Sequence, residues 1–421
     1  MPARPSAFRL DLVFYLVSLT FAGASALFSE FYGYRVWGNF ATIGYVLAFG
    51  AAVLGRRWLA VGFAGALAII VPTVVLVIRR SPDFVWGPWP WSFPSQPEVW
   101  VVERSARLLL DTGTPYMDFS TLGRAPIPDD YTPYGPAMTV FGLPRAIFGD
   151  SPVTDARVWF LIGSALVIML AWRAFGRPSV PVSAAQLAVI NPLTALTATV
   201  AGDDLPVIAL IVLATVLVYR AGPVPAGIVG ALVINMKLTA IIALGVLAVG
   251  MLAHRGARAL IVFLGTVVAA TAVIVLPVLL VDPGAFVEHV IKFPAGLGQA
   301  KSPAASPLPG HLIAATGSVG HAIAIGLLAA AACAIAAWLL VRPPRTAADA
   351  MLRIAAATTG AIMLAPASRW GYLIYPIVML GAMIAVNSTA APDPTAEPHA
   401  RGGTPAGPTE SAANPDTYRN V

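Results

Sequence analysis

Long apolar runs, separated by short polar turns, follow one another along most of the chain. Runs of about twenty apolar residues cross the hydrocarbon layer as helices, because a helix satisfies its own backbone hydrogen bonds there. The pattern therefore predicts an all-α polytopic membrane protein with about twelve transmembrane helices. The expected crossings are residues 11–28, 38–54, 58–78, 156–175, 182–200, 205–219, 224–236, 238–253, 258–281, 318–341, 349–366 and 371–386.

The composition supports this class of protein. Hydrophobic residues make up 58% of the chain and charged residues 11%, whereas a soluble domain carries roughly 25% charged residues. The net charge of +6 comes from arginines at the ends of apolar runs, which fits membrane topology, and no nucleic-acid partner is expected. The single cysteine, Cys333, excludes an internal disulfide, and the histidines lack metal-ligand spacing. We expect no metal and no other cofactor.

The distribution of arginines predicts the orientation in the membrane. With the N-terminus inside, most arginines in short turns face the cytoplasm, as the positive-inside rule requires. Arg79 and Arg80 are exceptions, at the start of a long outer loop. The first run also resembles a signal peptide, and we expect it to remain as an uncleaved anchor. The predicted parts are N-terminal transmembrane helices (1–78), an extracytoplasmic loop (79–155), a transmembrane bundle (156–386) with an outer loop (282–317), and a disordered cytoplasmic tail (387–421).

The long outer loop contains the signature of a helix. Ser95 followed by Glu98 fits a capping box, and Gly113 supplies the stop. The apolar positions between them fall on one face, with charged positions opposite. Residues 96–111 are therefore expected to form an amphipathic juxtamembrane helix on the outer side.

Two further features of this loop bear on its structure. Within the predicted helix, Glu103 and Arg107 have the spacing of an i, i+4 ion pair. The later stretch 129–149 combines paired carboxylates, tyrosines, prolines and glycines with a short apolar run. It is too broken for a full crossing, so it is expected to be a re-entrant or interfacial segment that lines a cavity.

One cation interrupts an otherwise apolar segment. Lys237 lies near the centre of residues 226–244, where a charge costs about 2.5–3.5 kcal/mol on insertion scales. An acidic or polar partner is therefore expected. Asp203 and Asp204 are candidates across the bundle, although they also have the position to cap a helix that starts at Leu205.

Several stretches, in this order over residues 90–380, resemble the polyprenyl-phosphate-dependent glycosyltransferases of the GT-C class, specifically glycosyltransferase family 87. The resemblance rests on an acidic residue that opens a juxtamembrane helix and on a lysine after a glycine-rich apolar run. Here the acid is Glu98 where the family usually has Asp, and the family's proline after the lysine is absent. The stretches are "RLLLDTGTPY" (107–116), "DDYTPYGP" (129–136), "AGDDLPVIALIVLA" (201–214), "AGIVGALVINMKLTA" (226–240) and "LAPASRWGYLIYP" (364–376).

The resemblance implies a GT-C-like bundle and an enzyme that moves a sugar, mannose or arabinose, from a polyprenyl-phosphate donor. The acceptor would be a lipid or glycan on the outer face of the cell membrane. Its hydroxyl must lose a proton, so a carboxylate is the expected base, and cations are expected at the donor phosphate. We predict Glu98, then Asp130, as the catalytic acid–base residue, and Lys237 and Arg369 as phosphate ligands. The predicted substrate-binding residues are Asp129, Tyr131, Tyr134, Asp203 and Asp204.

Alternatives remain open at this stage. Lys237 can be a structural partner of the two aspartates, and Arg369 an interfacial anchor. A lipid or solute transporter would also have many crossings and an intramembrane lysine on a broken helix, but no repeat relates the two halves of this chain. A non-catalytic partner in envelope assembly is the third possibility.

Overall fold

Residues 5–80 and 94–388 are described by the computed structural model, and in these ranges the regular elements are helices, with no strand. Most of the predicted tail, from residue 389, lies outside the described residues. The helices are α1 (Pro5–Phe28), α2 (Tyr32–Val53), α3 (Arg57–Gly65), α4 (Val71–Ile78), α5 (Pro97–Thr112), α6 (Leu143–Phe148), α7 (Ala156–Phe175), α8 (Val182–Ala188), α9 (Pro192–Val200), α10 (Asp204–Arg220), α11 (Pro223–Ile234), α12 (Ile241–Val281), α13 (Pro283–Phe286), α14 (Pro309–Ala314), α15 (Ser318–Val341), α16 (Ala347–Leu364) and α17 (Ile374–Asn387).

Eight helices in the described residues are long and apolar enough to cross a membrane, or nine if the bent pair α8 and α9 is one crossing. The chain is thus a multi-pass membrane protein, as predicted. The count of about twelve is not confirmed by length and composition. The difference arises where helices are short or broken: α8 and α9 meet at 46°, and α11 has only 12 residues.

The long helix α12 is broken at Gly256. Its 41 residues contain one position with non-helical backbone, Gly256, at φ 82° and ψ 177°. A straight helix of this length would measure about 60 Å, twice the thickness of the hydrocarbon layer. Leu244 before the break and Val267 after it both lie against Gly230 of α11. The chain therefore turns back at Gly256, within the predicted turn between residues 253 and 258.

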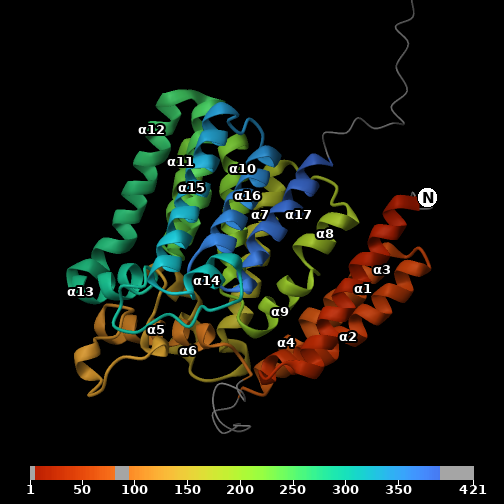
Figure 1. Ribbon diagram of the computed structural model, residues 1–421, viewed down its shortest axis with the longest axis horizontal. Coiled ribbons are helices and arrows are strands. Elements are labelled where there is room, and N and C mark those ends of the chain that lie inside the picture. The colour runs from red at the N-terminus through yellow and green to blue at the C-terminus, as the bar shows by residue number, and fades with distance from the viewer. Residues whose placement is uncertain (1–4, 81–93, 389–421) are drawn as a thin grey trace, which may run out of the picture.

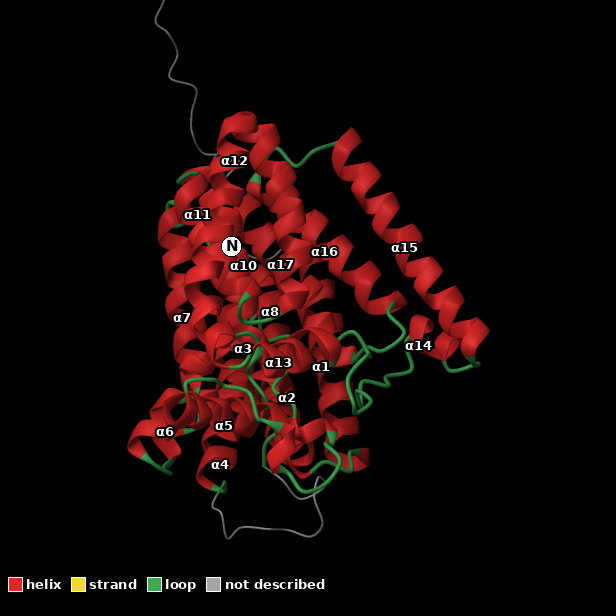
Figure 2. Ribbon diagram, turned by 90° about the vertical axis from the view of Figure 1, so that its left-hand side faces the viewer, coloured by secondary structure: helices red, strands yellow, loops and turns green. Residues whose placement is uncertain are grey.

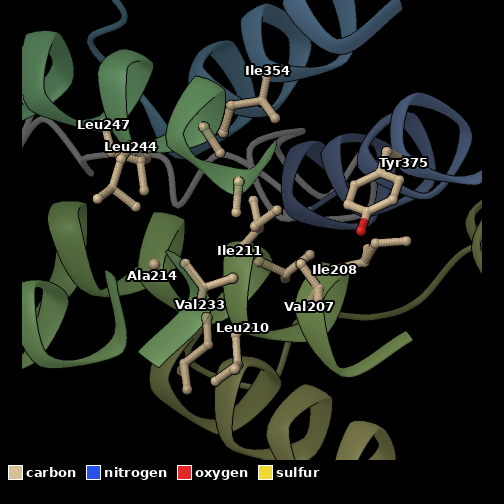
Figure 3. Packing of buried hydrophobic residues seen from close by; sticks show 14 of the residues in the cluster. Val207, Ile208, Leu210, Ile211, Ala214, Val233, Leu244, Leu247, Ile354 and Tyr375 are labelled. Atoms are coloured by element: carbon tan, nitrogen blue, oxygen red, sulfur yellow. The ribbon is translucent and has the colours of Figure 1, made fainter. Parts of the chain in front are cut away.

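Two apolar cores organise the helices. The larger one surrounds α10, which is apolar on every side and buried along most of its length. Side chains of α11, the first half of α12, α16 and α17 meet around it (Figure 3). A helix that is hydrophobic all round is stable only when other helices enclose it. The second core joins α1 to α4 with α9, and these N-terminal helices form a group of their own beside the main bundle (Figure 1).

Polar contacts fasten the N-terminal helices to the bundle. Asp11 of α1 is almost fully buried, and it accepts hydrogen bonds from Arg57 of α3 and Gln186 of α8. The hydroxyl of Tyr45 donates to the carbonyl of Ile190 at 2.8 Å. A carboxylate in an apolar helix needs such partners to offset its desolvation.

A helix, α5, is present where the sequence predicts one over residues 96–111, and Gly113 ends it with left-handed backbone at φ 80°. The capping box is wrong: the helix begins after Gln96 without a side-chain cap, and the hydroxyl of Ser95 has no partner. The pairing of Glu103 is also different, because Arg80 rather than Arg107 contacts it. The helices α5, α6, α13 and α14 gather at one end of the bundle (Figures 1 and 2).

A buried charge network joins the two ends of the segment that contains α5. Arg80 binds Glu103 at 2.6 Å and Asp155 at 2.9 Å. Arg157, which has no exposed surface, binds Asp155 and donates to the carbonyls of Pro94, Thr199 and Leu76. Such a network is stable only when every charge has its partner.

Replacement of Arg157 by Met is therefore expected to destabilise the protein by about 3–5 kcal/mol, because Asp155 keeps its buried charge with fewer partners. Lys292→Met is the control, since Lys292 is half-exposed and pairs with Glu288 on the surface, where a pair contributes about 0–1 kcal/mol. Thermal unfolding in detergent measures both. Equal shifts in Tm for the two variants would contradict the structural role of Arg157.

Candidate active site

The site is built around the end of α11, at Ile234. After Ile234 the backbone leaves the helix, so the last carbonyls lack helical partners. The segment before α6 supplies them: the N–H groups of Gly135 and Ala137 donate to the carbonyls of Met236 and Asn235 at 3.1 and 3.0 Å. A side chain at Gly135 would meet the carbonyl of Asn235 at 2.2 Å. Only glycine allows the two segments to lie this close.

Lys237 follows directly after this break, in extended backbone. Its ammonium group lies 3.1 Å from Asp203 and also contacts Asp204. The rings of Tyr134 and Tyr372 lie 5.6 and 5.2 Å from it. The ion pair between Lys237 and the aspartates, one of the alternatives left open by the sequence, is therefore present. The capping alternative does not hold for Asp203, which makes no side-chain cap on α10.

Two tyrosines complete the shell of the aspartates. The hydroxyl of Tyr134 donates to Asp203 at 3.1 Å, and the hydroxyl of Tyr375 donates to Asp204 at 2.6 Å. Each carboxylate thus has the lysine and one hydroxyl as partners. Hydrogen bonds to both carboxylates offset much of the cost of burying three charges together.

A second ion pair joins the start of α5 to the turn before α17. Glu98, in the first turn of α5, contacts Arg369, the residue before the short 3-10 helix Trp370–Leu373. The arginine side chain is 36% exposed and that of Glu98 16%. One oxygen of Glu98 accepts from Arg369, and the other is buried without a hydrogen-bond partner. A buried oxygen without a partner is unusual and marks a candidate functional group.

Tyr372 links the two pairs. Its N–H donates to the carbonyl of Arg369 at 3.1 Å, and its ring lies beside Lys237. The structure thus gathers, at one end of the bundle, two pairs whose members lie far apart in sequence. Sequence reasoning missed Tyr372 and Tyr375, although their spacing of three places them on neighbouring positions of a helix that follows Arg369.

The other predicted residues lie in a separate cluster, which we call the outer cluster after the predicted outer loop that contains them. Asp130 binds Arg124 at 2.6 Å and accepts from the N–H of Ile127. The hydrogen bond from Arg124 holds the pKa of Asp130 below its usual range, which weakens it as a base. Tyr131 is fully buried and donates to Glu288.

Arg104 of α5 fixes the backbone of this outer cluster. Its guanidinium group donates to the carbonyls of Asp129, Asp130 and Tyr131 at 2.8, 2.9 and 3.3 Å. Three bonds from one planar group hold the turn in a single conformation. Sequence reasoning also missed Arg104. An arginine that binds backbone carbonyls can do so whatever the side chains of the acceptor residues are, so the sequence does not reveal the contact.

An aromatic cluster packs this turn against the second outer region. The rings of Tyr131 and Phe293 stack at 4.0 Å. Buried His289 accepts from the N–H of Thr132 at 2.9 Å, and its other nitrogen lies 2.9 Å from the carbonyl of Met117. Burial lowers the pKa of His289 to about 4. The imidazole is therefore neutral at pH 7, as these two contacts require.

No group of three or more His, Cys, Asp or Glu in residues 5–80 and 94–388 is arranged to hold a metal ion. The polar side chains of the site described above are carboxylates, cations and tyrosine hydroxyls. Carboxylates accept protons, and a half-exposed guanidinium group binds anions such as phosphate.

Comparison with known families gives one match. The model of a family described as Glycosyltransferase family 87 matches residues 131–366, more than half of the chain. This range contains Asp203, Asp204 and Lys237, whereas Glu98 and Arg369 lie on either side of it. No match was found among curated proteins or solved structures.

The neutral His289 predicts a pH dependence of the outer cluster. A free imidazole gains its proton below about pH 6.5, whereas the docked one stays neutral down to about 4. The stability that docking of the neutral His289 imidazole gives to this cluster is therefore fully present above pH 6.5. It is lost as pH falls from 6.5 towards 4, and the loss is about 2 kcal/mol at pH 5. Hydrogen exchange of the Thr132 amide between pH 7.5 and 5 measures it, after correction for intrinsic exchange.

His289→Gln is the control for this experiment, because glutamine keeps a hydrogen-bonding side chain but does not titrate. Its exchange should show little dependence on pH beyond the intrinsic rate. An equal loss of protection in the wild type and in His289→Gln would assign the effect to other groups.

Proposed function

The chain belongs to glycosyltransferase family 87, and from this membership we propose that it transfers a sugar, mannose or arabinose, from a polyprenyl-phosphate donor. The acceptor in this proposal is a lipid or glycan at the outer face of the cell membrane. The observation that carries it is the partly exposed Glu98–Arg369 pair beside the buried Lys237 group. A base and phosphate-binding cations within one site are what such a transfer requires.

In the proposed reaction the acceptor hydroxyl oxygen attacks the anomeric carbon of the donor sugar. The bond between that carbon and the phosphate oxygen breaks, and its electron pair leaves with the polyprenyl phosphate. The hydroxyl proton passes to Glu98, whose unpartnered oxygen is available as acceptor. Asp130 is the weaker candidate, because both of its carboxylate oxygens accept from Arg124.

The developing negative charge on the phosphate needs cations. Arg369 is proposed to bind it directly, because a guanidinium group holds two phosphate oxygens at once. Lys237 is proposed to contribute its charge from the deeper position in which Asp203 and Asp204 hold it. Tyr134 orients Asp203. In this proposal Asp203, Asp204 and Tyr134 act on the donor indirectly, because they hold Lys237 in position.

The predicted acceptor side is the turn that contains Asp129 and Tyr131. Arg104 donates to the backbone carbonyls of both residues. The Tyr131 side chain is fully buried and supports the turn from within, so in this proposal the partly exposed Asp129 meets the acceptor. Fixed polar groups suit recognition of sugar hydroxyls, because little ordering entropy is lost on binding. We assign acceptor recognition to this turn.

The orientation belongs to the proposal as well. We propose twelve crossings, both termini in the cytoplasm, and residues 79–155 and 282–317 outside. The break of α12 at Gly256 supports this count, because each half then crosses once. Arg79 and Arg80, the exceptions to the positive-inside rule, stand at the start of a long loop, where the rule carries little weight.

Transfer itself is tested with purified protein, radiolabelled polyprenyl-phosphate sugars and a lipid extract. Label should appear in an acceptor, and Glu98→Gln should lower the turnover by roughly 10²–10⁴-fold, the usual contribution of a general base. Asp150→Asn is the matched control, because it removes one carboxylate from another arginine pair on the same loop. It should leave turnover unchanged.

Two results would change the assignment. Near-normal turnover by Glu98→Gln beside an inactive Asp130→Asn would move the base to Asp130. Movement of labelled lipid across vesicles without transfer by the wild type would favour the transporter and contradict an enzyme.

The orientation has its own test. Ser120 lies in an exposed turn of the loop 79–155, and Ser120→Cys in a Cys333→Ala background places one thiol there. An impermeant maleimide should label this thiol in intact cells freed of any outer barrier, because the proposal puts the loop outside. Labelling only after lysis would reverse the orientation and exclude an outer-face reaction.

A further inference from the structure

We propose that Arg369 exchanges its anionic partner during the reaction: the donor phosphate displaces Glu98 from the guanidinium group, and this displacement frees Glu98 to take the acceptor proton. Donor binding would thereby switch on the base. The inference rests on the proposed function, and it adds an order of events that the function alone does not require.

The first support is the loose geometry of the Glu98–Arg369 pair. A guanidinium group has five N–H donors, and only one of its nitrogens, Nη1, donates to Glu98. No other side-chain hydrogen bond of Arg369 is formed with the described residues. On the other side, Oε2 of Glu98 has no partner. Both members thus keep bonding capacity, so a phosphate can engage Arg369 before Glu98 leaves it.

The second support is the contrast with the other cations near the site. Lys237 contacts two carboxylates and has tyrosine rings beside it, and its side chain is 12% exposed. Arg80 binds two buried carboxylates and is 10% exposed. Arg369 has one carboxylate and 36% exposure. Among these three cations, its partner is the one that an incoming anion can replace at least cost.

The third support is that the backbone on both sides is fixed. The N–H of Gln96, two residues before Glu98, donates to the carbonyl of Val200 at 2.8 Å. On the arginine side, Ser306 accepts from the N–H of Trp370 at 3.0 Å and donates its own N–H to the carbonyl of Ser368. Because these hydrogen bonds hold both backbone segments in place, the exchange takes place by rotation of the Glu98 and Arg369 side chains.

The fourth support is the charge of the site. Three carboxylates, Glu98, Asp203 and Asp204, face two cations, Lys237 and Arg369. A phosphate added beside an ionised Glu98 meets repulsion at short range. Transfer of the acceptor proton to Glu98 removes its charge while the leaving phosphate gains one, so the total charge of the site stays constant during the step.

The same exchange provides for product release. After transfer, Glu98 holds the proton and Arg369 holds the polyprenyl phosphate. Loss of that proton to water restores the carboxylate, which then competes with the phosphate for Arg369. Glu98 is thus base in one half of the cycle and competing anion in the other.

Phosphate affinity tests the exchange without turnover. The probe is farnesyl phosphate, a short-chain analogue of the leaving lipid phosphate, with binding to the full-length protein in detergent measured by calorimetry. Glu98→Gln should bind it about tenfold more tightly than the wild type, because the competing charge is gone. Asp150→Asn, the matched control, should bind it like the wild type. Arg369→Gln should weaken binding and, in combination with Glu98→Gln, remove the gain.

Each outcome decides the question. If Glu98→Gln does not fold, Glu98→Ala removes the same charge and should show the same gain. Unchanged or weaker binding by a folded Glu98 variant would overturn the exchange. If that variant also lacks transfer activity while the wild type transfers sugar, the proposed function stands and the exchange alone fails. Absence of both binding and transfer in the wild type would overturn both.

Discussion

The break after α11 is the constraint on which the rest of the site depends. A helix that ends inside the protein leaves carbonyls without partners, and Lys237 beside them adds a charge whose side chain is only 12% exposed. Protein groups must satisfy both. The segment at Gly135 supplies the N–H donors, and Asp203 and Asp204 supply the counter-charge. One break therefore requires that the segment at Gly135 docks onto the bundle and that two carboxylates lie at the start of α10.

The Lys237 group is fully paired, so the Glu98–Arg369 pair can have a different role. Lys237 and its aspartates are held by tyrosine hydroxyls and rings, so they form a fixed field. The Glu98–Arg369 pair has fewer contacts and more exposure. A fixed charge cluster can stabilise an anion without moving, whereas a loosely held pair can change partners. The fixed group and the more loosely held pair are joined through Tyr372, whose N–H donates to the carbonyl of Arg369 and whose ring lies beside Lys237.

The sequence predicted those features that follow from local patterns. Apolar length predicted the multi-pass class, and glycine at position 113 predicted the end of α5, because a left-handed stop is a local requirement. The adjacent acids at the start of the apolar run 205–219, Asp203 and Asp204, were correctly named as possible partners of Lys237. Features that depend on tertiary packing were not predicted. Glu103 pairs with Arg80 and not with its i+4 neighbour, since α5 turns that face inward, and Tyr375 reaches Asp204 across 171 positions of sequence.

The family match and the contacts divide the site in the same way. Residues 131–366 contain the fixed group of Lys237, Asp203 and Asp204. Glu98 and Arg369 lie in the flanks, and residues of the N-terminal helices support both sides: Gln96 donates to Tyr34 of α2, and the ring of Trp370 packs edge-on against Phe21 of α1 at 5.9 Å. The N-terminal helices are therefore more than an anchor. Through Gln96 and Trp370 they contact both backbone segments that carry the Glu98–Arg369 pair, so they support the site from the side that the family match does not include.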